Sequence, residues 1–205
     1  FLTIPLLLSS LILGYLYWGA TDTEEKYAEV MAATGSVVRY ELPDHAVVWL
    51  NSGSTLRYPT VFKKDNRNVE LKGEAYFEVE SDKEHPFIVK TKQLTVEATG
   101  TAFNVNAYAP DHVAAVTLVK GKVAVTLDQK KTISLSPGEK IDYNLATSLY
   151  NVNKTNTYKW CSWKDGILIF RDDPLEYVFK RLGQTYNVES VSYTHLRAHE
   201  TKANL

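Results

Sequence analysis

Two histidines near the C-terminal end have a spacing that suits a metal ion. His195 and His199 are four residues apart and Glu200 is adjacent, so on a helix both imidazoles would lie on one face. No third ligand is evident nearby, and we therefore expect no metal site there. The other histidines lie in turn-like segments and are interpreted as surface residues: His45, His85 and His112.

The other residue types that could do chemistry also have simpler explanations. Cys161 lies between Trp160 and Trp163 with no evident histidine partner, so a small buried residue is the better interpretation than a nucleophile. Glu78 and Glu80 alternate on one strand face, where solvation explains them better than glycosidase chemistry. Aromatic side chains could line a sugar-binding face, although core packing is their commoner role: Trp49, Tyr76, Phe77 and Tyr108. The sequence therefore predicts no enzyme and no cofactor.

The composition favours a β-rich protein without a nucleic-acid partner. The 205 residues include 23 basic and 24 acidic side chains, and the formal net charge of −1 provides no field that would attract nucleic acid. The 13 tyrosines, together with a middle section rich in valine and threonine, favour strands over helices. The single cysteine excludes an internal disulfide.

The first residues have the length and composition of a membrane helix. Residues 1–21 carry no charge and are strongly apolar, and about 20 such residues span a bilayer. A secretory signal peptide is the alternative, but no basic segment precedes the run and no small-residue cleavage site closes it. We therefore predict a transmembrane helix over residues 1–20, then a juxtamembrane linker over 21–34 with a short polar helix at 23–33. The predicted membrane-spanning side chains are Leu2, Leu6, Leu7, Leu11, Ile12, Leu16 and Trp18.

Residues 35–150 are predicted to form a β domain. Stretches of alternating apolar and polar residues follow one another, and turn residues separate them. Glycines precede several of these stretches at spacings of 17 to 27 residues: Gly35, Gly53, Gly73, Gly100, Gly121 and Gly138. This recurrence favours a solenoid-like stack of β layers, with a sandwich-like fold as the alternative.

Residues 151–189 read as the beginning of a βαβ unit. Residues 166–170 resemble a buried strand, and Asp173 and Pro174 form a helix start. Apolar residues at helical spacing follow, Gly183 is a plausible helix end, and residues 186–188 would begin a second strand. The unit stops before it could close a domain.

Together these residues resemble the FecR family of transmembrane anti-sigma regulators, in the form common in Bacteroidetes. The longest matching stretch is VELKGEAYFEV at residues 69–79, and the resemblance covers roughly residues 35–189. Other matching stretches are residues 42–44, 48–52, 56–59, 85–91, 100–108, 117–123, 135–139, 163–166 and 174–188. One departure is Asp44-His45-Ala46, where the family has Asp-Gly-Ser, so the turn there is expected to differ. Residues 190–205 do not continue the pattern, and we expect them to be a non-native tail on a chain truncated at both ends.

The resemblance implies a signal relay rather than catalysis. It implies a single-pass protein of the bacterial inner membrane with most of the chain in the periplasm. One implied partner is the signalling domain of an outer-membrane TonB-dependent transporter. The other is an extracytoplasmic-function sigma factor, bound through a cytoplasmic segment missing here. The regulated genes would serve uptake of iron-siderophores or glycans.

For contact with the transporter we predict residues of the incomplete βαβ unit: Leu168, Phe170, Pro174, Leu175, Val178 and Leu182. The alternative function is a membrane-anchored β module that binds glycan or cell wall.

Overall fold

The computed structural model describes residues 9–10, 12–15, 25–62, 67–82, 84–108, 112–128 and 131–188. Residues 9–10 and 12–15 are helical. Within the described ranges, no helix combines the length and the apolar character needed to cross a membrane. Of the predicted membrane-spanning side chains, Ile12 is described and is exposed. The others lie outside the described residues: Leu2, Leu6, Leu7, Leu11, Leu16 and Trp18.

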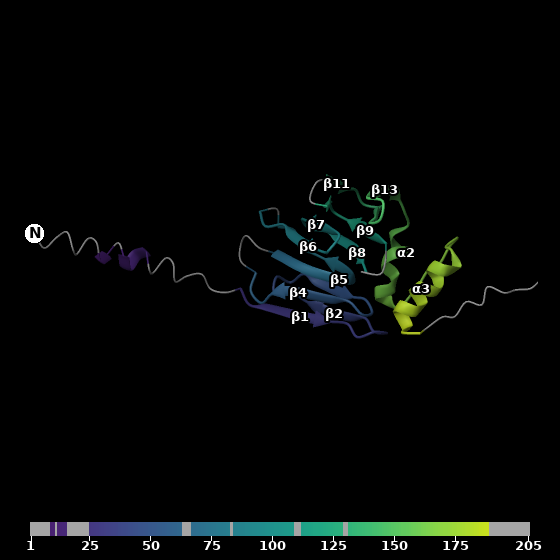
Figure 1. Ribbon diagram of the computed structural model, residues 1–205, viewed down its shortest axis with the longest axis horizontal. Coiled ribbons are helices and arrows are strands. Elements are labelled where there is room, and N and C mark those ends of the chain that lie inside the picture. Colours follow the sequence, from purple (N-terminus) through teal and green to yellow (C-terminus); the bar gives the residue numbers. More distant parts are fainter. Residues whose placement is uncertain are drawn as a thin grey trace, which may run out of the picture.

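The rest of the described chain is dominated by a curled, half-barrel sheet of 13 strands (Figure 1). In chain order these are β1 (Tyr27–Met31), β2 (Val38–Glu41), β3 (Val47–Leu50), β4 (Thr55–Pro59), β5 (Arg67–Glu78), β6 (Phe87–Lys90), β7 (Leu94–Ala98), β8 (Ala102–Ala107), β9 (Val113–Lys120), β10 (Val123–Leu127), β11 (Lys131–Leu135), β12 (Glu139–Asn144) and β13 (Leu149–Lys154). After β13 come α2 (Thr157–Cys161), the 3-10 helix η1 (Ser162–Asp165) and α3 (Leu175–Tyr186). The mainly β prediction is confirmed.

β5 belongs to both halves of this sheet. Its residues 67–72 pair with β4 and β6, whereas residues 73–78 pair with β8 and, in part, with β3. We call β1, β4, β6, β7, β10 and β11, with the start of β5, the first half-sheet. The second half-sheet consists of β2, β3, β8, β9, β12 and β13 with the end of β5.

The two half-sheets curl around one hydrophobic core. Phe77 of the second half-sheet stacks on Phe103 at 5.1 Å between ring centroids and contacts Phe87 of the first half-sheet at 5.9 Å. All three rings are fully buried, and each contributes about 1.5–3 kcal/mol to folding through its removal from water. The core therefore ties the two half-sheets together beyond their shared strand.

The solenoid-like arrangement predicted from the glycine recurrence is wrong, and the sandwich-like alternative comes closer. A coiled stack would pair its layers in parallel, but among the described pairs β5 with β6 is parallel and the others are antiparallel. The recurring glycines instead share positive φ angles between 67° and 99°. Residues with L side chains disfavour a positive φ. The glycines therefore mark turns and bends, and their spacing is not the period of a repeating structure.

The chain before residue 35 contributes to the sheet. The short helix predicted at 23–33 is wrong, because Tyr27–Met31 forms β1 and pairs with β4. Exposure alternates along β1, and Ala28 and Val30 pack against the core. This alternation of period two stabilises a strand at a sheet edge and not a helix.

The turn at Asp44-His45-Ala46 keeps the backbone conformation that glycine would supply. His45 has a φ of 64°. Its N–H donates to the carbonyl of Leu42 at 2.9 Å, and the N–H of Leu42 donates to the carbonyl of Ala46 at 2.8 Å. The departure from the family pattern therefore changes the residue but leaves a tight left-handed turn.

In the C-terminal segment only the helix of the predicted βαβ unit is observed among the described residues. Residues 167–170 form no strand, because no described strand lies beside them to pair with. Pro174, not Asp173, is the N-cap residue of α3. The helix continues past Gly183 to Tyr186, and its C-cap residue Asn187 has a left-handed φ of 55°.

Gly73 lies where β5 passes between the half-sheets, and its replacement by alanine should be destabilising. Its φ is +99°, and a Cβ there would lie 2.4 Å from the Ser54 Oγ and 2.9 Å from the Ser54 Cα. We expect Gly73→Ala to lower the free energy of unfolding by about 3 kcal/mol or more. Urea denaturation would measure the change.

Gly53→Ala is the matched control, because Gly53 has a φ of +67° but open space around its Cα. Only backbone strain of about 1–2 kcal/mol should apply there. An equal loss for both variants would show that the close approach of Ser54 does not constrain β5.

Candidate functional site

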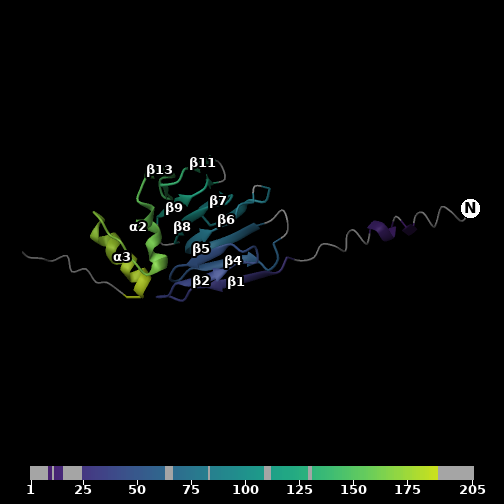
Figure 2. The same ribbon diagram turned by 180° about the vertical axis from the view of Figure 1, so that it is seen from behind.

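The helical segment after β13 covers part of the outer face of the second half-sheet. Figures 1 and 2 show α2 and α3 together at one side of the sheet. Tyr76 of β5 points away from the main core and forms a small second core with Cys161 and Trp163. Trp49, Ala102, Val119, Trp160 and Leu168 pack around these three residues. The segment is therefore attached to the sheet by apolar contact as well as by the polar contacts described next.

A buried carboxylate, Glu74, lies at the centre of this contact. Glu74 follows the bend at Gly73 and is 2% exposed. Its Oε2 accepts hydrogen bonds from Arg181 Nη1 of α3 at 2.6 Å and from Asn51 Nδ2 at 2.7 Å. Its Oε1 accepts from Asn104 Nδ2 of β8 at 3.0 Å. Both oxygens are thus satisfied, as a buried charge requires.

The same network extends to η1. Asn104 Oδ1 accepts a hydrogen bond from the indole Nε1 of Trp163 at 3.1 Å. We call the connected residues Glu74, Asn51, Asn104, Trp163 and Arg181 the Glu74 network. It joins β5, β8 and the turn after β3 to both η1 and α3. It therefore fixes how the helices lie on the sheet.

Electrostatics keep Arg181 charged in this buried position. Arg181 is 7% exposed. Burial acts to lower the pKa of its guanidinium, but the charge of Glu74 and the hydrogen bond to it outweigh burial, and the pKa lies above its ordinary value. A buried ion pair adds modest net stability, yet removal of one partner leaves an uncompensated charge. The pair therefore specifies the docked position of α3.

Two further contacts hold the ends of the segment. Ser52 Oγ donates to the carbonyl of Gln184, near the end of α3, at 2.5 Å. Lys159 Nζ of α2 lies 2.8 Å from the carboxylate of Asp173, just before α3, and both side chains are mostly buried. Burial acts to raise the pKa of Asp173, but hydrogen bonds from Lys159 and from the backbone N–H of Arg171 outweigh it and the pKa is lowered.

Cys161 is shielded inside this contact. Its side chain is buried beside Tyr76. Burial, with a smaller contribution from the negative charge of Glu74, raises the pKa of the thiol to about 12. The thiol is therefore protonated at neutral pH, in which state it is a poor nucleophile.

The predicted docking residues do not lie on one surface. Leu168 packs on the second core. Pro174 is exposed and Leu175 is 70% exposed. Phe170, Val178 and Leu182 are half-buried. Their role in binding a partner stays a prediction.

The sequence interpretation missed Glu74 and Arg181. The helical repeat places Arg181 beside and not within the apolar stripe of Leu175, Val178, Phe179 and Leu182. The sequence therefore contained no signal that this arginine is buried. It also contained no signal for which carboxylate is its partner.

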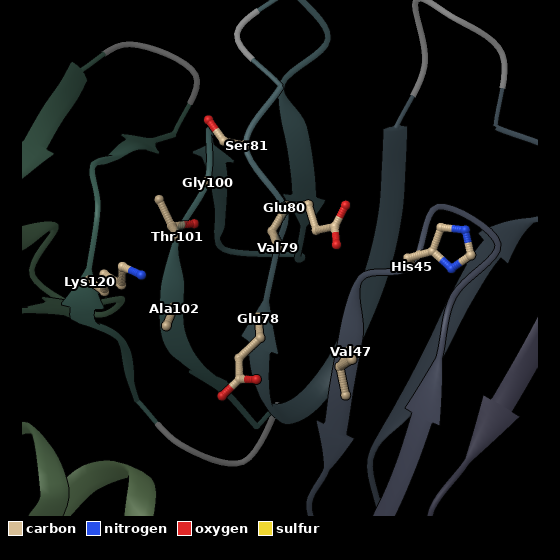
Figure 3. Close-up of a pocket in the computed structure, with 10 residues that line it drawn as sticks. All are labelled: His45, Val47, Glu78, Val79, Glu80, Ser81, Gly100, Thr101, Ala102 and Lys120. Carbon is tan, nitrogen blue, oxygen red and sulfur yellow. The ribbon is translucent and has the colours of Figure 1, made fainter.

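A hollow with a volume of about 520 Å³ lies where β3, β5 and β8 meet at one end of the second half-sheet. Glu78, Glu80 and Lys120 line it together with His45. Figure 3 shows that the carboxylates of Glu78 and Glu80 point away from each other. They are not arranged as a catalytic acid and base.

In the described part of the chain, no group of three or more His, Cys, Asp or Glu side chains could hold a metal ion. The His195, His199 and Glu200 side chains lie outside the described residues.

Comparisons with known proteins agree on one class. Residues 28–124 match the sequence model of the FecR protein family. Two crystal structures of a candidate anti-sigma factor from Parabacteroides distasonis ATCC 8503 are similar to this chain. One is 37% identical with a TM-score of 0.76, over 80% of this chain and 76% of the other. The second is 38% identical with a TM-score of 0.75, over 79% of this chain and 76% of the other. No protein in the curated set matches.

Both comparisons therefore support a regulatory protein of the anti-sigma class. The chain belongs to the FecR family. That membership supports a role as an anti-sigma factor or signal transducer.

Replacement of Arg181 by methionine should loosen α3 from the sheet. The variant leaves the Glu74 carboxylate buried without its cation, which should weaken docking of α3 by about 3–5 kcal/mol. Amide hydrogen exchange of α3 would measure this as faster local opening.

Arg57→Met is the matched control, because Arg57 and Glu70 form an exposed ion pair, with side chains 43% and 55% exposed. Such pairs contribute about 0–1 kcal/mol. Unchanged exchange of α3 in Arg181→Met would contradict a structural role for the ion pair.

Acidification should remove the contribution of Asp173. Because its folded-state pKa is lowered, the ionised carboxylate stabilises the fold above the unfolded-state pKa of about 3.9. That stability is lost as the pH falls below about 4 towards the folded-state pKa. Asp173→Asn should therefore destabilise the protein at pH 7 and match wild type near pH 2, as measured by urea denaturation with tryptophan fluorescence.

Asp165→Asn serves as the control, because the Asp165 side chain is 43% exposed in its pair with Lys164. This variant should change stability little at either pH. A pH-independent effect of Asp173→Asn would show that its charge is not what holds the segment.

Proposed function

We propose that the protein is an anti-sigma regulator anchored in the bacterial inner membrane by one helix, with its sheet and helical segment in the periplasm. It relays the loaded state of an outer-membrane TonB-dependent transporter to an extracytoplasmic-function sigma factor. The sigma factor then controls genes for uptake of iron-siderophores or glycans. Membership of the FecR family supports this proposal, and the protein acts by binding rather than by catalysis.

The observation that carries the proposal is the docking of α3 through the Glu74 network. A relay needs an element with two arrangements whose balance a partner can shift. The contacts of α3 include the buried ion pair Glu74–Arg181, the hydrogen bond from Ser52 to Gln184 and the ring contact of Tyr177 with Trp160. A transporter domain that bound α3 better in its released position would shift the balance towards release.

The side of α3 that faces solvent offers a surface for this partner. Leu175 is 70% exposed, Tyr186 57% and Phe179 37%. Exposed apolar side chains grouped on one helix are typical of binding surfaces. Leu175 was predicted from the sequence as a docking residue, and Phe179 and Tyr186 extend that surface.

Substitutions on this surface should weaken binding without unfolding the protein. We expect Leu175→Asp with Phe179→Asp to reduce affinity for the transporter signalling domain at least about tenfold, because each places a charge in an apolar contact. Pull-down and calorimetry with the full chain would measure it.

The control is Leu149→Asp, since Leu149 is 69% exposed on β13, away from α3. Its affinity should equal wild type. If the α3 variant also bound like wild type, contact with the transporter would have to lie on the sheet.

A transcriptional reporter tests the relay itself. In cells that carry the complete gene, its sigma factor and its transporter, Arg181→Met should change reporter output in the absence of the transported substrate, because α3 is already released. Reporter output that responds to substrate in both wild type and a strain lacking this gene would exclude the relay.

A further inference from the structure

One turn of the sheet is hydrogen-bonded both to α3 and to the chain that follows β1. We call residues 51–54, which lie between β3 and β4, the junction turn. Asn51, Ser52 and Ser54 are buried, with exposed fractions of 3% or less. The hydrogen bonds of these residues are therefore shielded from water, which would otherwise compete for their donors and acceptors.

The junction turn holds the chain after β1 through its backbone and through one side chain. The Ala32 N–H donates to the carbonyl of Ser54 at 2.9 Å, and the Gly53 N–H donates to the carbonyl of Ala32 at 3.1 Å. The Gly35 N–H donates to the Ser52 Oγ at 2.8 Å. Because β1 is a strand of five residues at the sheet edge, paired with β4, these bonds secure its C-terminal end.

The same turn holds α3 at two residues. Ser52 Oγ donates its proton to the carbonyl of Gln184 at 2.5 Å. Asn51 Nδ2 donates to the carboxylate oxygen of Glu74 that also accepts from Arg181. The chain after β1 and the docked helix, which are far apart in the sequence, therefore meet at the junction turn.

The Ser52 Oγ is the atom that these two sets of hydrogen bonds share. A hydroxyl has one proton to donate and lone pairs to accept, and here it donates to Gln184 while it accepts from Gly35. Donation polarises the O–H group and makes its oxygen a stronger acceptor. Loss of the Gln184 carbonyl therefore weakens the bond from Gly35, and it also opens the buried hydroxyl to water.

We propose that the Ser52 hydroxyl couples the docked position of α3 to residues 32–35, so that release of α3 loosens the C-terminal end of β1. Ser52 is thus a positioning residue. Coupling is reciprocal, so loosening residues 32–35 weakens the docking of α3 by the same factor.

For its direction this coupling rests on the proposed function. α3 carries the surface proposed to contact the transporter, and β1 follows the segment predicted to cross the membrane. A signal that released α3 would therefore reach the strand next to the anchor. The coupling itself is a property of the folded chain, and it can be measured without transporter or sigma factor.

The test is amide hydrogen exchange of the purified full chain in detergent, measured over residues 32–35. Arg181→Met releases α3 through Glu74, so any effect on residues 32–35 has to be transmitted. We expect exchange there to become about three- to tenfold faster, the range that one hydrogen bond contributes. Exchange of β8 and β9 should stay at the wild-type rate, which shows that the sheet remains folded.

A double-mutant cycle then identifies the atom that transmits the effect. In a Ser52→Ala background, Arg181→Met should change exchange of residues 32–35 by less than about twofold. Ser36→Ala is the matched control, because Ser36 Oγ donates to the carbonyl of Ala33 at 2.8 Å within the same exposed segment. In that background the acceleration should equal that in wild type.

Two results would overturn the proposal. One is unchanged exchange of residues 32–35 in Arg181→Met while α3 itself exchanges faster. The other is equal acceleration in the Ser52 and Ala-substituted backgrounds. Gly35 also lies near the helix end, where a Cβ on it would be 3.8 Å from the Asn187 Cβ, and equal acceleration would assign the coupling to that contact. Neither result alters the pull-down with the transporter domain, so failure here is distinct from failure of the signal relay.

Discussion

The sharing of β5 by two half-sheets is the constraint on which the other features depend. The strand must pair with β4 and β6 along one part and with β3 and β8 along the other, so its backbone bends at Gly73. The bend places Glu74 on the outer face, directly beside the position of α3. The residue that holds the helical segment is thus positioned by the same bend that shapes the core.

The helical segment after β13 is attached by a small apolar contact, made mainly by α2 and η1, and by a polar contact, made by η1 and α3. The second core contains few buried side chains, whereas the Glu74 network requires several hydrogen bonds to form together. Apolar contacts tolerate sliding, but a buried ion pair with satisfied partners has one arrangement of low energy. This combination suits a helix that must lie in a defined place and yet be able to leave it.

The sequence predicts the strands well because exposure alternates along most of them, and Leu94–Ala98 is an example. It does not predict which strands pair, because alternation reports the face of a side chain and not its neighbour. The glycine spacing suggested layers, since a sequence does not show that Gly73 and Gly121 have positive φ angles. The contact between Glu74 and Arg181 joins residues 107 positions apart, so no local pattern could reveal it. The strand predicted at 166–170 needed a neighbouring strand that the described chain does not contain.

The reactivity of Cys161, the single cysteine of the chain, depends on whether the helical segment covers the sheet. While α2 and η1 cover the sheet, the thiol is both shielded and protonated, so an alkylating reagent cannot modify it. Each detachment of the segment exposes the sulfur to water and restores an ordinary thiolate fraction. If the segment detaches, the rate of alkylation would therefore rise with the fraction of time that it is detached.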